Sequence, residues 1–327
     1  MKRRLLLAAG IAGLVLPAIA KAQAQQKVYR VAILAAGGRT PDGGPPGPLR
    51  DSLRALGYVE GRNIAYEARF AEGRMERLAG FGAELARLKV DAIVAIGFRA
   101  ALAAKQATAS IPIVTAPVAG DLVAAGLIAS AARPGGNVTG LTDESGPLSA
   151  KRLQILKEAL PKATRIAVLW NSDDQGMTLR YREIEKAARL LNVEVQPIGM
   201  RDPADFASAF AEMTRHRPDA IFLVADALTF MNRKQFIEFA ATQRIPAMYE
   251  FSSYIRDGGL MSYGPSIEEN FQRAAAYLDR IFRGAKPTDL PAEYPTRYYL
   301  TINQKAAETL GLTIPPILLF QADDVVK

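Results

Sequence analysis

Short apolar runs rich in β-forming residues alternate with amphipathic helical stretches through the first half of this 327-residue chain. The pattern predicts strands at 28–34, 63–69, 91–96 and 113–115, and helices at 49–56, 75–88, 100–107 and 122–131. Nearly continuous apolar strands are typical of a parallel sheet that is covered by helices on both faces. This half is therefore expected to form a doubly wound α/β sheet.

The same alternation restarts in the second half. Strands are predicted at 165–170, 194–198, 219–224 and 247–249, and helices at 178–191, 204–214 and 232–240. Both halves contain an Asp-Ala-Ile strand start, at 91–93 and 219–221, and an Ile-Pro strand entry, at 111–112 and 245–246. The alternative is chance repetition of a common βα rhythm. We expect an α/β protein with two similar doubly wound parallel-sheet lobes.

Three further segments are predicted to connect the lobes: the turn-rich stretch at 133–140, a second at 258–264, and a third at 298–302. The helix expected at 267–282 belongs to neither repeat. We therefore expect one lobe to comprise 25–140 plus about 264–299, and the other 141–263 plus about 300–327. Three crossings would form a hinge that allows the lobes to close over a ligand.

Residues 1–24 have the character of a signal peptide. Lys2, Arg3 and Arg4 precede an apolar run at 5–16, and small residues then offer several cleavage positions. A retained membrane anchor is the alternative, but the run is short for a bilayer span. The basic pair also leaves twin-arginine export open beside the general route. The expectation is a periplasmic protein with no stable membrane anchor after cleavage.

Composition excludes several classes of function. Cleavage would remove four basic residues and lower the formal charge from +8 to +4, and the remaining Lys and Arg are scattered, so no nucleic-acid partner is expected. The chain has no Cys, which excludes disulfides and a lipid-modified Cys at the cleavage site. With His216 as its one histidine, it offers little for metal or His-dependent catalytic sites. We expect a monomer without a cofactor.

Several motifs resemble one known family. They are 57–64 (GYVEGRNI), 72–73 (EG), 111–114 (IPIV), 133–140 (RPGGNVTG), 151–153 (KRL), 259–264 (GLMSYG) and 310–316 (LGLTIPP). In this order they resemble the ABC-transporter substrate-binding protein family that includes tryptophan-uptake binding proteins. The resemblance implies a type I periplasmic-binding-protein fold and delivery of a small solute to an ABC transporter permease. It leaves the solute open.

Candidate ligand-binding residues follow the strands, because ligands of such sheets bind beyond the carboxyl ends of the strands. The loop after the first strand offers Gly37. Similar proteins often have a small hydroxyl residue early in this loop, and this chain has none there. Gly97, Phe98 and Arg99 start a helix, where Arg99 could clamp a carboxylate or form an ion pair on the rim. Thr115 could donate its hydroxyl.

The second lobe contributes the remaining candidates. Asn171 is a possible donor, and Asp226 could bind an ammonium group or cap the next helix. The other candidates, which combine aromatic rings with one carboxylate, are Tyr249, Glu250, Phe251 and Tyr263. Their rings could line a solute cleft or pack between the lobes.

These observations favour a solute-binding protein for an amino acid or a small carboxylate. An exported sensor subunit is a second interpretation. A hydrolase that uses Asp226 and Glu250 as its carboxylate pair is a third.

Overall fold

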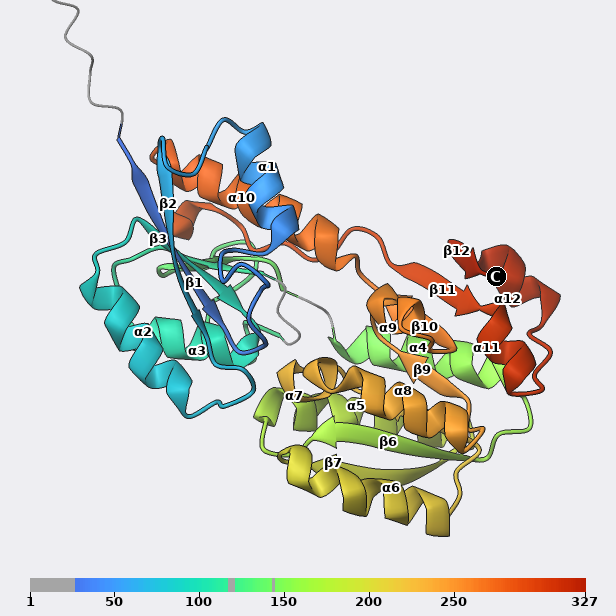
Figure 1. Ribbon diagram of the computed structural model, residues 1–327. Coiled ribbons are helices and arrows are strands. Elements are labelled where there is room, and N and C mark those ends of the chain that lie inside the picture. Colours follow the sequence, from blue (N-terminus) through green and yellow to red (C-terminus); the bar gives the residue numbers. More distant parts are fainter. Residues whose placement is uncertain (1–26, 117–120, 143–144) are drawn as a thin grey trace, which may run out of the picture.

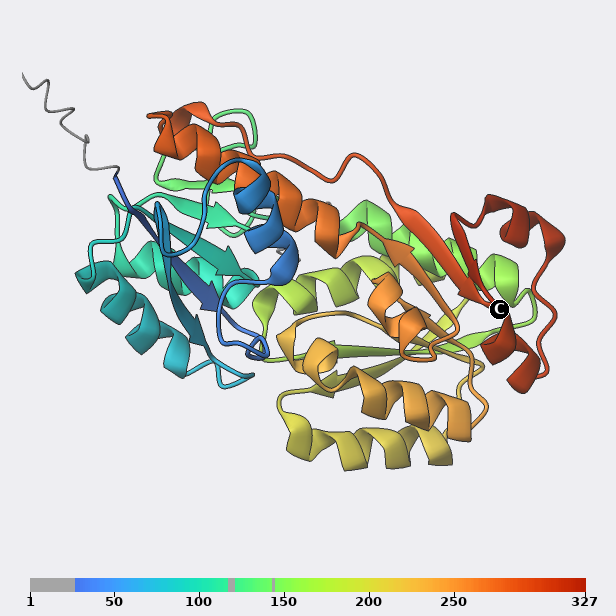
Figure 2. The same ribbon diagram turned by 45° about the horizontal axis from the view of Figure 1, so that its top comes forward.

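A computed structural model describes residues 27–116, 121–142 and 145–327, so the expected signal peptide at 1–24 lies outside the described residues. Two α/β lobes are joined by extended segments (Figure 1), and the view turned by 45° shows the same arrangement (Figure 2). Within the described ranges, no helix is both long and apolar enough for a membrane span.

The first lobe is built on a five-stranded parallel sheet in the order β2-β1-β3-β4-β5. Its strands are β1 (Tyr29–Ala35), β2 (Ile64–Phe70), β3 (Ala92–Ile96), β4 (Ile113–Thr115) and β5 (Val138–Gly140). Side chains alternate between the two faces of each strand: Leu34 packs in the cluster with α2 (Arg77–Arg87) and α3 (Phe98–Ala107), whereas Ile33 packs in the cluster with α1 (Gly47–Ala55) and α10 (Ile267–Phe282). Burial on both faces explains the uninterrupted apolar runs.

The second lobe has a seven-stranded sheet in the order β12-β11-β10-β9-β8-β6-β7, in which the β10–β11 pair is antiparallel and the others are parallel. Its strands are β6 (Arg165–Asn171), β7 (Glu194–Met200), β8 (Ala220–Leu223), β9 (Ala247–Tyr249), β10 (Met261–Gly264), β11 (Tyr299–Asn303) and β12 (Asp324–Val326).

Helices again cover both faces of this sheet. One cluster holds side chains of α4 (Ser145–Ala159), α5 (Gln175–Leu190), α11 (Gln304–Thr309) and α12 (Pro316–Gln321). The opposite cluster holds side chains of α6 (Phe206–Arg215), α7 (Ala227–Met231), α8 (Arg233–Thr242) and α9 (Ser252–Arg256). Short 3-10 turns lie at η1 (Pro203–Asp205) and η2 (Pro287–Asp289). The predicted α/β class with two parallel-sheet lobes is confirmed.

The helix predicted at 122–131 is wrong, because the chain forms only turns there. Gly126 takes a φ of +67°, and the amides of Leu127 and Ile128 both bond to the carbonyl of Leu122 instead of continuing a helix. Asp121 accepts hydrogen bonds from the next backbone amides, as a cap would.

The chain passes between the lobes after β5, after β10 and before β11. The first and third passages lie side by side, since the amide of Glu293 donates to the carbonyl of Gly140 at 2.9 Å and the amide of Thr142 donates to the carbonyl of Glu293 at 3.0 Å. The three segments expected to connect the lobes include residues of β5, β10 and β11. The second passage therefore begins only after Gly264. It leads into α10, which packs on the first lobe.

Gly140 ends β5 at the first passage, with a φ of +118°. A Cβ there would lie 2.6 Å from the amide nitrogen and 2.7 Å from the carbonyl oxygen of Thr115. We expect Gly140→Ala to lower the free energy of unfolding by about 2 kcal/mol or more through backbone strain and overpacking. Urea unfolding checks this against Gly136→Ala, which adds a Cβ in open space. A loss at Gly140 no larger than the loss at Gly136 would contradict the analysis.

Candidate functional site

A cavity of about 300 Å³ lies between the lobes, at the carboxyl ends of β1, β3, β6 and β8. Residues of the first two passages, Leu141, Thr142 and Pro265, and the first residues of α10 also line it. Seven of the predicted site residues line it: Gly37, Gly97, Phe98, Arg99, Asn171, Asp226 and Phe251. The rule that places ligands beyond parallel strand ends therefore locates this cavity.

The first lobe presents the start of α3 to the cavity. Gly97 precedes the helix with a φ of +93°, a conformation that turns the chain sharply at the end of β3. The first amides of a helix have no partner within it, so they favour an anion. Arg99 lines the same wall, and its Nη1 donates to the carbonyl oxygen of Asp173 in the second lobe at 3.2 Å.

The second lobe presents Asp226 at the end of β8. Its Oδ1 accepts from the amide of Thr229, which completes a capping box at the start of α7, and its Oδ2 accepts from Nδ2 of Asn171 at 2.7 Å. Burial raises the pKa of Asp226, and the neighbouring Asp174 carboxylate raises it further. Asp226 therefore caps α7, as predicted, and also lines the cavity, while its binding of an ammonium group stays a prediction.

Asp174 is a second carboxylate in the cavity wall. It caps α5 through hydrogen bonds from the amides of Gly176 and Met177, and burial raises its pKa. It is not among the site residues predicted from the sequence. Its position just beyond β6 is the signal that could have identified it, because Asp226 occupies the matching position beyond β8.

Much of the remaining wall is apolar and aromatic. The rings that line it are Phe70, Phe98, Phe230, Phe251 and Phe271. Asn270 interrupts this apolar surface from α10. It is 6% exposed, and its side-chain amide forms no hydrogen bond within the described ranges. A polar residue on the buried face of an amphipathic helix was the signal for Asn270 in the sequence.

Four predicted site residues lie outside this cavity. Thr115 is buried in the first sheet, where its hydroxyl donates to the carbonyl of Leu141 at 2.7 Å. Tyr249 is buried in the second lobe and stacks on Tyr254 with ring centroids 4.8 Å apart. The ring of Tyr263 packs against the ring of Tyr298, with centroids 6.1 Å apart.

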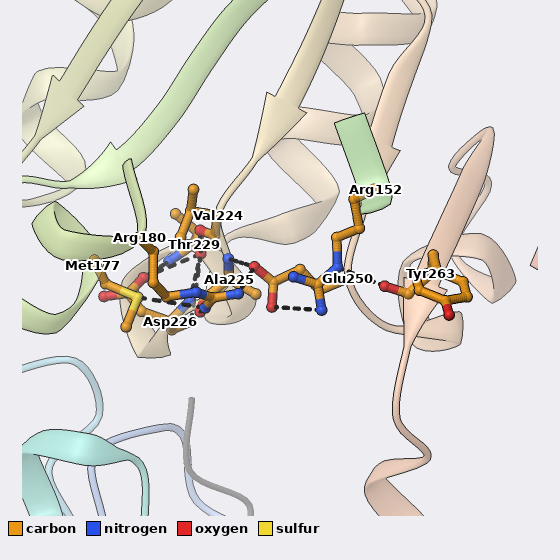
Figure 3. Close-up of polar contacts among 9 residues, drawn as sticks. All are labelled: Arg152, Met177, Arg180, Val224, Ala225, Asp226, Thr229, Glu250 and Tyr263. Carbon is orange, nitrogen blue, oxygen red and sulfur yellow. Dashed lines mark hydrogen bonds and ion pairs between the residues drawn. The ribbon is translucent and has the colours of Figure 1, made fainter. Parts of the chain in front are cut away.

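Glu250 is the fourth. It is buried, does not line the cavity, and lies between Arg180 and Arg152 (Figure 3). Its Oε1 lies 2.5 Å from Nη2 of Arg180, and its Oε2 lies 3.6 Å from Nη2 of Arg152. Burial by itself would raise the pKa of Glu250, but the two guanidinium groups hold the pKa below its ordinary value. Because Glu250 is held ionised away from the cavity, it cannot pair with Asp226 over a substrate as a hydrolase would require.

The two lobes touch around the cavity. A Cβ on Gly176 would lie 3.6 Å from the ring of Phe98, across the interface. A Cβ on Gly38 or Gly73 of the first lobe would lie 3.8 or 3.6 Å from the side chain of Met231 in α7. The hydrogen bond from Arg99 to the carbonyl of Asp173 joins the lobes at the cavity wall. Among the described residues, no three His, Asp or Glu side chains gather as a metal site would require.

The sequence pattern of the family described as ABC transporter substrate binding protein matches residues 46–326. The chain belongs to this family. A tyrosine-binding protein from Clostridioides difficile is 26% identical over 280 residues, covering 84% of this chain and 80% of that protein. The chain is thus a solute-binding protein of the ABC-transporter type.

Several solved structures have the same architecture. A conserved domain protein from Vibrio cholerae is 27% identical with a TM-score of 0.85, covering 91% of this chain and all of that one. A Streptococcus pneumoniae protein in complex with L-Trp is 23% identical with a TM-score of 0.84, covering 92% of this chain and all of that one. An open, ligand-free substrate-binding protein from Clostridium difficile is 23% identical with a TM-score of 0.65, covering 92% and 99% of the two chains. The predicted type I periplasmic-binding-protein fold is confirmed.

The raised pKa of Asp226 makes this family member's stability depend on pH in a definite direction. A carboxyl whose pKa is raised by folding stabilises the protein below its unfolded pKa of about 3.9, and that contribution is lost as pH rises through the folded pKa. Replacement by Asn avoids the loss. We expect the unfolding free energy of Asp226→Asn, relative to wild type, to increase from about pH 4 to about pH 7.

Asp219 provides a control of opposite sign. Partial burial would raise its pKa, but hydrogen bonds from the amides of Thr164 and Arg165 lower it. Its contribution is present above the unfolded pKa of about 3.9 and is lost as pH falls through the lower folded pKa, so the stability difference between Asp219→Asn and wild type should stay nearly constant from about pH 4 to about pH 7 and change only at lower pH. Urea unfolding at both pH values measures both differences. A difference for Asp226→Asn that does not change with pH would contradict the analysis.

Proposed function

We propose that this solute-binding protein captures an amino acid with an apolar, aromatic or branched side chain and delivers it to the permease of an ABC transporter. The observation that carries the proposal is a carboxylate, Asp226, in a largely apolar cavity between two lobes. We further propose that the chain works in the periplasm as a monomer after loss of residues 1–24.

The ammonium group of the solute would bind at Asp226. Burial raises the pKa of this carboxyl, which means that its charged form is poorly solvated. A cation at hydrogen-bond distance would restore that stabilisation and make the pair strong. Asp174 adds negative charge to the same wall, and Asn171 holds Asp226 in place.

The carboxylate of the solute would bind to the first lobe. The free amides at the start of α3 and the side chain of Arg99 both favour an anion. Asn270 adds an amide that no described residue engages. Because these groups and Asp226 belong to different lobes, an amino acid would contact both and favour the closed arrangement.

The side chain of the solute would pack against the phenylalanine rings. Among the other predicted residues, we assign Gly37, Gly97, Phe98 and Phe251 to the cavity wall, whereas Thr115, Tyr249, Glu250 and Tyr263 act outside it. A tyrosine-binding relative and an L-Trp complex in the same fold support an aromatic amino acid. A sensor role is not favoured by any particular contact.

The solute can be identified directly. Protein purified without refolding should retain solute, because closed clefts release it slowly, and mass spectrometry after denaturation should detect an amino acid. Recovery of a sugar or a polyamine instead would contradict the proposal. L-Phenylalanine, L-tyrosine, L-tryptophan and L-leucine would then be titrated by calorimetry against protein that was unfolded, dialysed and refolded.

Asp226→Asn keeps the shape and the capping ability of the side chain but removes its charge. We expect roughly 10- to 100-fold weaker binding of L-phenylalanine, and less than about a twofold change for 3-phenylpropionate, which lacks the ammonium. Asn270→Leu should show the reverse preference, with a loss for L-phenylalanine and little change for 2-phenylethylamine, which lacks the carboxylate. Calorimetry measures all of these. Equal losses for both ligands in Asp226→Asn would make Asp226 a cap only.

A further inference from the structure

The buried charges of Arg180, Glu250 and Arg152 connect the solute site to a passage between the lobes (Figure 3). We propose that Glu250, acting through Arg180 and Arg152, is a positioning residue that holds the Asp226 segment and couples solute binding to movement at the passage that follows Gly264. This inference rests on the proposed function of Asp226 and adds a residue that does not itself contact the solute.

The first half of the connection fixes the backbone beside Asp226. Ala225 donates its amide hydrogen to Oε1 of Glu250 at 3.0 Å, and its carbonyl accepts from Nη1 of Arg180 at 3.3 Å. Arg180 and Glu250 also bond to each other at 2.5 Å. The backbone N–H and C=O of Ala225, the residue before Asp226, are therefore both bound by the Arg180–Glu250 ion pair.

The second half reaches the passage between β10 and α10. Nη2 of Arg152 lies 3.6 Å from Oε2 of Glu250, and Nε of the same residue donates to the carbonyl oxygen of Tyr263 at 2.6 Å. The next residue, Gly264, packs so closely on the backbone of Glu250 that a Cβ would collide with the carbonyl oxygen of Glu250. Beyond Gly264 the chain enters the first lobe, where α10 brings Asn270 to the cavity.

The burial of these three charged side chains indicates that they position the backbone more than they stabilise the fold. Arg152, Arg180 and Glu250 are each at most 1% exposed. Apolar side chains of similar volume would fill such a space at least as stably, because the loss of hydration offsets much of the attraction between buried charges. What apolar side chains could not do is hold the carbonyl of Tyr263 and both polar groups of Ala225 in one connected array. Asp226 therefore lies on a support that also holds the passage.

Amide exchange tests the connection without any solute. Arg152→Lys keeps a buried cation beside Glu250, but the methylene Cε of lysine takes the place of Nε, so the donor to the carbonyl of Tyr263 is lost from that position. If the array couples the two ends, amide exchange should become at least fivefold faster at Tyr263 and Gly264 and also at Ala225 and Asp226. Faster exchange confined to residues 263 and 264 would overturn the proposal.

Glu250→Gln keeps the shape and one acceptor oxygen while removing the charge. We expect faster exchange at both ends and at least tenfold weaker binding of L-phenylalanine. Asp219→Asn is the matched control, since this carboxylate anchors the opposite ends of β6 and β8, and it should change neither quantity. If Glu250→Gln does not fold, the Arg152→Lys exchange pattern alone decides. If wild type does not bind L-phenylalanine or the other amino acids, the proposed function fails, while the exchange data still decide the connection.

Discussion

A partly buried aspartate just beyond the end of β8 provides the interaction on which the rest of the site depends. Asp226 remains in place because a capping box and an asparagine satisfy its oxygens, yet burial still raises its pKa. Such a carboxylate has unused capacity for a cation. The opposite lobe supplies groups that favour an anion, so the two lobes together match a solute with charges of both signs.

The sheets make this arrangement possible. Parallel strands end at the same edge, so β6 and β8 bring Asp174 and Asp226 together although the two residues are far apart in the sequence. In the first lobe, β3 and α3 aim helix amides and Arg99 at the same space. The cavity is therefore a consequence of two equivalent α/β lobes whose strand ends face each other across three passages.

The sequence predicted the lobes and the placement of Asp226 and Arg99, because periodicity and strand ends determine both. It could not place Glu250, which also follows a strand. Two arginines from α4 and α5 draw this carboxylate into the interior, and no local pattern reveals partners so distant. Tyr249 is the last residue of β9, and its side chain falls on the core face of the strand. The second passage follows Gly264, the last residue of β10.

Calorimetry of proton exchange tests the central role of Asp226 most directly. L-Phenylalanine would be titrated into wild type in two buffers of different ionisation enthalpy, between about pH 4 and pH 6, above the ordinary aspartate pKa of about 3.9. An ammonium at Asp226 lowers its raised pKa, so binding should release protons, and Asp226→Asn should abolish this release. Binding without proton release, or equal release in the variant, would contradict the account.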